Sequence, residues 1–99
     1  MSEELARFEA TLGDPAPAPG LAPALAGLWW GLRGAWDQAH RIVQAHEDDP
    51  AACWVHAWLH RIEGDLGNAA YWYRRAGRSM PRGSTEEEGR AIARALLAG

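Results

Sequence analysis

The stretch HAWLHRIEGDLGNAAYWYRRAGR, residues 56–78, decides the fold of this 99-residue chain. It divides into two helix-forming segments at Gly64, which ends the first, and Asp65, which caps the second. Alanines and aromatic residues recur in both segments at helical spacing, and no part of the chain alternates apolar and polar residues over the length of a strand. The stretch therefore predicts a pair of packed helices in an all-α fold.

Capping residues indicate further helices on both sides of this stretch. Ser2 can cap a first helix, and Asp49 followed by Pro50 is typical of a helix start. Ser84 and Glu87 form a capping box for a last helix. The helices predicted from these signals cover about residues 1–12, 21–33, 35–47, 50–63, 66–79 and 84–97.

The chain is expected to form one helical domain with an N-terminal extension. The segment GDPAPAPG, residues 13–20, is too rich in proline for a helix and predicts an extended linker. It separates the N-terminal helix, residues 1–12, from a repeat-like domain over residues 21–99. A chain of this length supports a single core of modest size.

The middle of the chain contains an internal repeat of small and large side chains. Two sets of five residues have the same spacing, apart from one residue before the proline: Gly34, Ala39, Val43, His46 and Pro50, and Gly64, Ala69, Tyr73, Ala76 and Pro81. Alanines at these positions let two helices approach closely. The repeat therefore predicts a second helix pair of the same kind as the first.

This pattern resembles degenerate tetratricopeptide repeats over about residues 21–81, with a period of about 30 residues rather than the usual 34. The resemblance implies two stacked antiparallel helical hairpins, which the N-terminal helix and a C-terminal helix can cap. In that family the concave groove binds peptide segments. The opening stretch, as HAxLHRxEGDxxNAxYWYRRAG, also resembles a segment of small uncharacterised bacterial proteins, which implies no activity.

Composition and charge narrow the range of functions. A net charge of −3 argues against general nucleic-acid binding, which needs a basic face. A single cysteine excludes an internal disulfide and suits a reducing compartment, and no apolar run is long enough to cross a bilayer. The N-terminus lacks the features of a signal peptide. We therefore expect a cytoplasmic protein without membrane contact, and we assign the acidic run 86–88 to the dipole at a helix N-terminus.

Several polar side chains are predicted to meet inside the domain. At 100° per residue, His56, His60 and Glu63 share the face of their helix that also carries Leu59, so this face is expected to point inward. The resemblance to a tetratricopeptide hairpin, in which the alanine stripe packs on the partner helix, implies that Tyr73 lies near them, and His40 on the preceding helix can abut the same face. The predicted cluster consists of His40, His56, His60, Glu63 and Tyr73.

Three interpretations of this cluster stay open. It can be a hydrogen-bonded core network, because a buried histidine without a partner costs about 1–3 kcal/mol. It can be a metal site of His56, His60 and Glu63, completed by His40 or Glu47, for which the imidazoles favour a transition metal such as zinc. It can also be an acid–base site for a small ligand.

The opposite face of the same helix carries Trp54, Trp58 and Arg61. In the resembled family this side lines the groove, and tryptophan and arginine dominate the binding energy of protein interfaces. This face therefore predicts a partner-binding surface. The alternative is that its tryptophans pack beneath the second, sixth or N-terminal helix and belong to the core.

Two functions of different classes follow from these residues. The repeat-like architecture favours a non-catalytic helical module that binds a protein or peptide partner, with self-association as one form. The alternative is a metal- or small-ligand-binding protein that uses the polar cluster, with an enzyme as one version. The sequence gives an enzyme no support, because it contains no nucleophile motif, no HExxH motif and no phosphate-binding loop.

Overall fold

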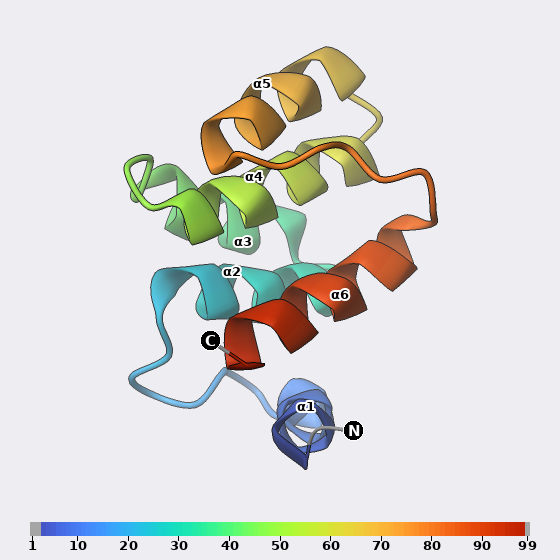
Figure 1. Ribbon diagram of the computed structural model, residues 1–99. Coiled ribbons are helices and arrows are strands. Elements are labelled where there is room, and N and C mark those ends of the chain that lie inside the picture. The colour runs from blue at the N-terminus through green and yellow to red at the C-terminus, as the bar shows by residue number, and fades with distance from the viewer. Residues whose placement is uncertain (1–2, 99) are drawn as a thin grey trace.

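The computed structural model describes residues 3–98, which are helical throughout apart from turns and loops and contain no strand (Figure 1). The elements are α1 (Glu3–Ala10), the short 3-10 helix η1 (Thr11–Gly13), α2 (Pro23–Leu32), α3 (Trp36–Gln44), α4 (Pro50–Ile62), α5 (Leu66–Ala76) and α6 (Thr85–Ala98). The all-α prediction is thereby confirmed. The capping role predicted for Ser2 lies outside the described residues.

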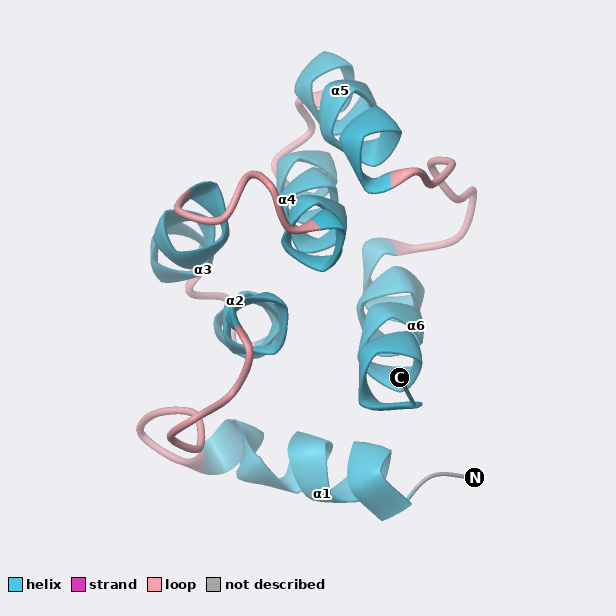
Figure 2. Ribbon diagram, turned by 60° about the vertical axis from the view of Figure 1, so that its left-hand side comes forward, coloured by secondary structure: helices cyan, strands magenta, loops and turns pink. Residues whose placement is uncertain are grey.

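Helix α4 lies at the centre of the fold. It packs against α2, α3, α5 and α6, which surround it in Figure 2. Its sequence, PAACWVHAWLHRI, is apolar on nearly every side, and the nine consecutive residues 52–60 are all buried. A helix that is apolar all round is stable only when neighbours cover every face. Asp49 starts it as predicted, because its side chain accepts a hydrogen bond from the Ala51 amide at 3.0 Å.

Two pairs of consecutive helices form the body of the domain: α2 with α3, and α4 with α5. The glycines expected to end the first helix of each pair, Gly34 and Gly64, have φ angles of +82° and +85°, which favour glycine. Within α2, Gly27 and Gly31 allow close packing: a Cβ atom at Gly31 would lie 2.5 Å from Trp58. A relationship of these pairs to tetratricopeptide repeats stays a prediction.

Helix α6 crosses the face of α4 that α3 leaves uncovered, and it also packs against α2 (Figure 1). Its predicted capping box is confirmed. The Ser84 hydroxyl accepts a hydrogen bond from the Glu87 amide, and the Glu87 carboxylate accepts one from the Ser84 amide, both at 3.0 Å. Gly89 lets α6 approach the ring of Trp58 closely.

The N-terminal helix folds back onto the domain. Helix α1 contacts α6, and its Phe8 is buried in the common core. Within η1, the Thr11 hydroxyl accepts a hydrogen bond from the indole of Trp29 in α2 at 3.0 Å. The proline-rich segment therefore connects η1 and α2, which are in contact with each other. None of the helices between residues 3 and 98 is long and apolar enough to cross a membrane.

Two predicted helix ends are wrong by three residues. Helix α5 ends at Ala76 rather than near residue 79, because Gly77 adopts a left-handed conformation with φ +72°. Helix α3 ends at Gln44 rather than at Glu47. Residues 45–48 form a turn that leads into Asp49 and Pro50. The residue before a proline is disfavoured in helical geometry, and Asp49 accordingly is extended, with φ −96° and ψ 110°.

Candidate metal centre

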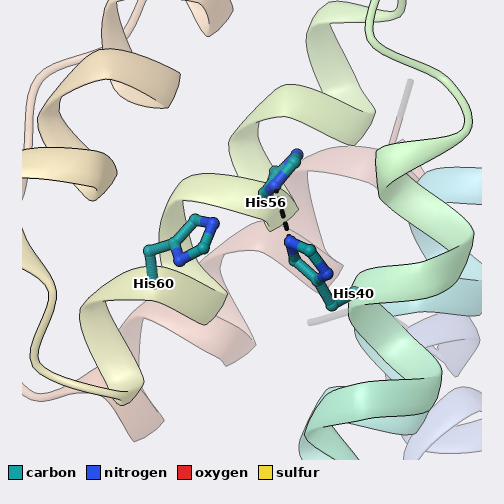
Figure 3. A group of neighbouring side chains, drawn as sticks. All are labelled: His40, His56 and His60. Carbon is teal, nitrogen blue, oxygen red and sulfur yellow. Dashed lines mark hydrogen bonds between the residues drawn. The ribbon is translucent and has the colours of Figure 1, made fainter.

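Three imidazole rings face one another between α3 and α4 (Figure 3). His40 comes from α3, and His56 and His60 lie one turn apart on α4. The Nε2 atoms of His40 and His56 are 3.1 Å apart, and one ligating nitrogen of each ring lies within 4.8 Å of the other two. Three of the five residues in the predicted polar cluster therefore bring ring nitrogens together. We call these three residues the histidine cluster.

Glu63 orients one ring of the histidine cluster. The Nδ1 atom of His60 lies 2.6 Å from the Glu63 carboxylate, three residues further along the chain. Because the carboxylate can only accept, Nδ1 of His60 donates this bond, and Nε2 is the ring nitrogen left for other contacts. A histidine that binds a metal usually donates its other N–H to a carboxylate, a carbonyl or water. Glu63 thus contacts His60 in the way that such a partner contacts a metal-binding histidine.

Two tryptophans hold the other rings in place. Trp36 stacks on His40, with ring centroids 4.7 Å apart and an interplanar angle of 11°. Trp72 stacks on His56 at 3.8 Å and 14°. The Trp36 indole also donates a hydrogen bond to the Leu59 carbonyl at 2.6 Å, which fixes it against α4. Indoles rather than acidic side chains therefore set the orientation of His40 and His56.

The surroundings of His40 and His56 favour neutral imidazoles. Burial, followed by the proximity of His40 and then of His60, lowers the pKa of His56 to about 3. The pKa of His40 is lowered mainly by burial, and next by the nearby His60. At neutral pH both rings are unprotonated, which is the form of histidine that binds metal ions.

One ring nitrogen of the cluster has no hydrogen-bond partner among the described residues. His56 is 2% exposed, and its Nδ1 atom is buried without a donor or acceptor within reach. A buried polar atom in this state costs about 1–3 kcal/mol. Such atoms commonly mark a place where water or an ion supplies the missing contact. The histidine cluster is therefore incompletely satisfied by protein groups alone.

The histidine cluster forms one wall of a cleft of about 600 Å³. The remaining lining comes from Gln44, Glu47, Asn68 and Trp72. His40 is half-buried at this cleft, whereas His56 and His60 are buried beneath it. An ion among the three rings would therefore have a path from solvent.

The donor set fits a transition metal ion. Nitrogen ligands about 2.0–2.1 Å from a tetrahedral zinc or cobalt ion lie about 3.3 Å from one another. The separation of 3.1 Å between the Nε2 atoms of His40 and His56 is close to this value. The ligating nitrogen of His60 lies within 4.8 Å of the other two and would have to move closer to complete the set. Imidazole ligands suit zinc, copper, nickel and iron rather than calcium or magnesium.

Tyr73 does not belong to the cluster, and this part of the prediction is wrong. Its hydroxyl donates to both carboxylate oxygens of Glu88, at 2.7 and 2.6 Å. Trp72, the preceding residue, lies against His56 instead. Successive helical residues point about 100° apart, so a small error in the rotation of α5 exchanges one aromatic residue for the other. Glu47 lines the cleft but is absent from the set of mutually close ligand atoms.

The tryptophan face of α4 lies in the core rather than in an open groove. Trp54 and Trp58 are 7% and 2% exposed, and the side chain of Arg61 is 12% exposed. Helix α6 and the turn before it cover them: the Trp58 indole donates to the Thr85 carbonyl at 2.7 Å, and Arg61 donates to the Gly83 carbonyl. The packed alternative is thus the one observed, and the predicted groove is wrong. Partner binding stays a prediction, but the buried face of Trp54, Trp58 and Arg61 gives it no support.

Sequence reasoning missed the residue that organises this second region. Glu88 is 5% exposed and accepts hydrogen bonds from Tyr73, from Trp54 at 3.3 Å and from Arg61 at 2.8 Å. We call these four residues the Glu88 cluster. The prediction assigned Glu88 only to the helix dipole. Its place four residues before the buried Ile92 was the available signal, because residues at that spacing share a helix face.

Comparisons with known proteins give no match to this chain: no family model, no curated protein and no solved structure is similar to it.

Proposed function

We propose that this protein binds a divalent transition metal ion through His40, His56 and His60, with Glu63 orienting His60. The observation that carries the proposal is the convergence of three imidazoles without a carboxylate between them. Neutral rings in this arrangement direct lone pairs toward a shared space. A divalent cation satisfies these lone pairs together, whereas a single proton can bridge only two of them.

The competing interpretation is a hydrogen-bonded core network. Within such a network, the hydrogen bonds between His40 and His56 and between His60 and Glu63 would stabilise the fold. That network exposes one edge of the cluster to a cleft, whereas the unpartnered Nδ1 of His56 is common to the network and to a metal site that uses Nε2. Apolar side chains of similar size would fill a purely structural position without these costs. The opening of the cluster to the cleft therefore favours the metal site.

The test is metal binding by the purified, untagged protein. Metal-depleted protein is titrated with Zn²⁺, and bound metal is measured by elemental analysis after gel filtration. We expect about one ion per chain and a higher melting temperature, which a chelator reverses. The double variant His56→Ala/His60→Ala should lose the metal, whereas His46→Ala should keep it, because His46 is exposed and outside the cluster.

A further variant covers the case in which the double variant does not fold. His40 is half-buried, so His40→Gln should preserve the helical circular dichroism spectrum and still weaken zinc binding. A folded wild type that retains less than a tenth of an equivalent of Zn²⁺ would overturn the proposal. Equal zinc affinity of wild type and His40→Gln would overturn the assignment of His40.

A further inference from the structure

We infer that the metal ion has one coordination position open to the cleft and that this position binds a small anion from solvent. The inference rests on the proposed function, since it concerns the same three histidines. It adds a ligand class to the site: small monoanions that can coordinate a cation end-on. Azide is a suitable probe of that class.

The number of protein ligands leaves a position open. Among the described residues, the set of mutually close donor atoms around His56 contains only the three histidine nitrogens. Zinc and cobalt in such sites take at least four ligands, and three protein ligands with one exchangeable position is the arrangement of reactive sites. Buried helices occupy the sides from which His56 and His60 project, so the remaining position faces the cleft.

Charge favours an anion at this position. Three neutral imidazoles leave the charge of a divalent ion uncompensated, and Glu63 offsets one unit of it from behind His60. A monoanion would neutralise the site. Gln44 and Asn68, whose amide groups can donate hydrogen bonds, line the same cleft as the cluster.

Glu47 sets how strongly the site attracts an anion. It is the only carboxylate among the residues that line this cleft. Its backbone is fixed in place, because its carbonyl accepts hydrogen bonds from Cys53 Sγ at 3.2 Å and from Arg75 at 2.9 Å. A negative charge at the cleft repels incoming anions, so removing it should tighten their binding.

The experiment uses the Co²⁺-loaded full chain, because the visible absorption of Co²⁺ reports both its coordination number and ligand exchange. Azide is titrated into wild type, Glu47→Gln and Asp48→Asn at low ionic strength. We expect a saturable change in the Co²⁺ bands of the wild type. Glu47→Gln should bind azide about threefold to tenfold more tightly, as expected for removing one nearby charge.

Asp48→Asn is the matched control, because it removes the same charge from an exposed neighbour that does not line the cleft. It should leave azide affinity close to that of the wild type. Tetrahedral Co²⁺ bands that azide does not change would overturn the open position while leaving the metal site intact. Equal azide affinity of the two variants would overturn the role of Glu47. The absence of Co²⁺ absorption would overturn the metal site itself.

Discussion

His56 shows how a buried titratable residue is constrained from several sides at once. Trp72 covers one face of its ring, Nε2 meets His40, and Nδ1 has no partner within the described part of the chain. A proton on this ring would add charge in a buried place beside two other imidazoles. Its chemistry therefore depends on remaining neutral, which has consequences for the metal-free protein.

We expect the stability of the metal-free protein to decrease as the pH falls from about 6.5. The pKa of His56 is about 3 in the fold and about 6.5 in an unfolded chain, so between these values only the unfolded chain holds the proton. Protonation therefore favours unfolding, with a slope of at most about 1.4 kcal/mol per pH unit for one histidine. The lowered pKa of His40 acts in the same direction.

Urea unfolding between pH 7.5 and 5 measures this effect, because ordinary carboxyl groups stay ionised over most of that range. His46→Ala should show the same slope as wild type, since His46 is exposed. A free energy of unfolding that stays constant across this range would contradict the neutral state of His56.

Glu63→Gln tests the orienting role of the carboxylate. The amide can still contact His60 but no longer holds the Nδ1 proton with a negative charge. We expect zinc affinity to fall about 10-fold to 100-fold, as is usual when the partner of a metal-binding histidine is changed. Competition with a chromophoric chelator measures the affinity, with Glu4→Gln, an exposed change on α1, as control. Affinities equal to wild type would show that Glu63 does not act on the site.

Individual helices were predictable where local signals define them. Asp49 with Pro50 and Ser84 with Glu87 start α4 and α6 as their capping chemistry predicts. The shared face of His56, His60 and Glu63 also follows from helix geometry alone. The rotation of α5 was not predictable in this way, because a few tens of degrees decide between Trp72 and Tyr73, and only packing against α4 and α6 fixes them.

Gly31→Ala tests how tightly these helices interlock. A Cβ atom there would lie 2.5 Å from the Trp58 ring, so the indole or α2 must shift. We expect a loss of about 1–3 kcal/mol in the free energy of unfolding, despite the better helix propensity of alanine. Gly67→Ala, in α5 with no atom within 4 Å, should instead be neutral or stabilise the protein by up to about 1 kcal/mol. Urea unfolding of both variants gives the comparison, and equal effects would contradict the close approach.

At the scale of the whole molecule, α6 determines which surfaces exist. It covers the face of α4 that was predicted to line a binding groove, so that Trp54 and Trp58 are buried. It also contributes Glu88 to a buried ion pair with Arg61. Neither result could be read from helical periodicity, because both depend on a segment more than twenty residues away returning to α4. The chain length predicted a single core of modest size, but not which helix covers it.

Glu88→Gln tests whether the Glu88 cluster joins α4, α5 and α6. The change leaves Arg61 as a poorly compensated buried charge and weakens the acceptor for Tyr73. Breaking one partner of a buried pair typically costs about 3–5 kcal/mol, and we expect a loss in this range in urea unfolding. Glu86→Gln, exposed on the same helix turn, should change stability by less than about 0.5 kcal/mol. Similar stability of both variants would show that Glu88 is not required.

The position of the histidine cluster between α3 and α4 has a topological consequence. His40 and His56 are 16 residues apart and belong to different helix pairs. An ion bound to both would close the chain between them into a loop that includes the turn from α3 to α4. Such a closure restricts the unfolded chain much as a disulfide does. A chain with one cysteine cannot make that bond from its own thiols. The ion would thus be a removable cross-link, and metal supply would determine how readily the two pairs separate.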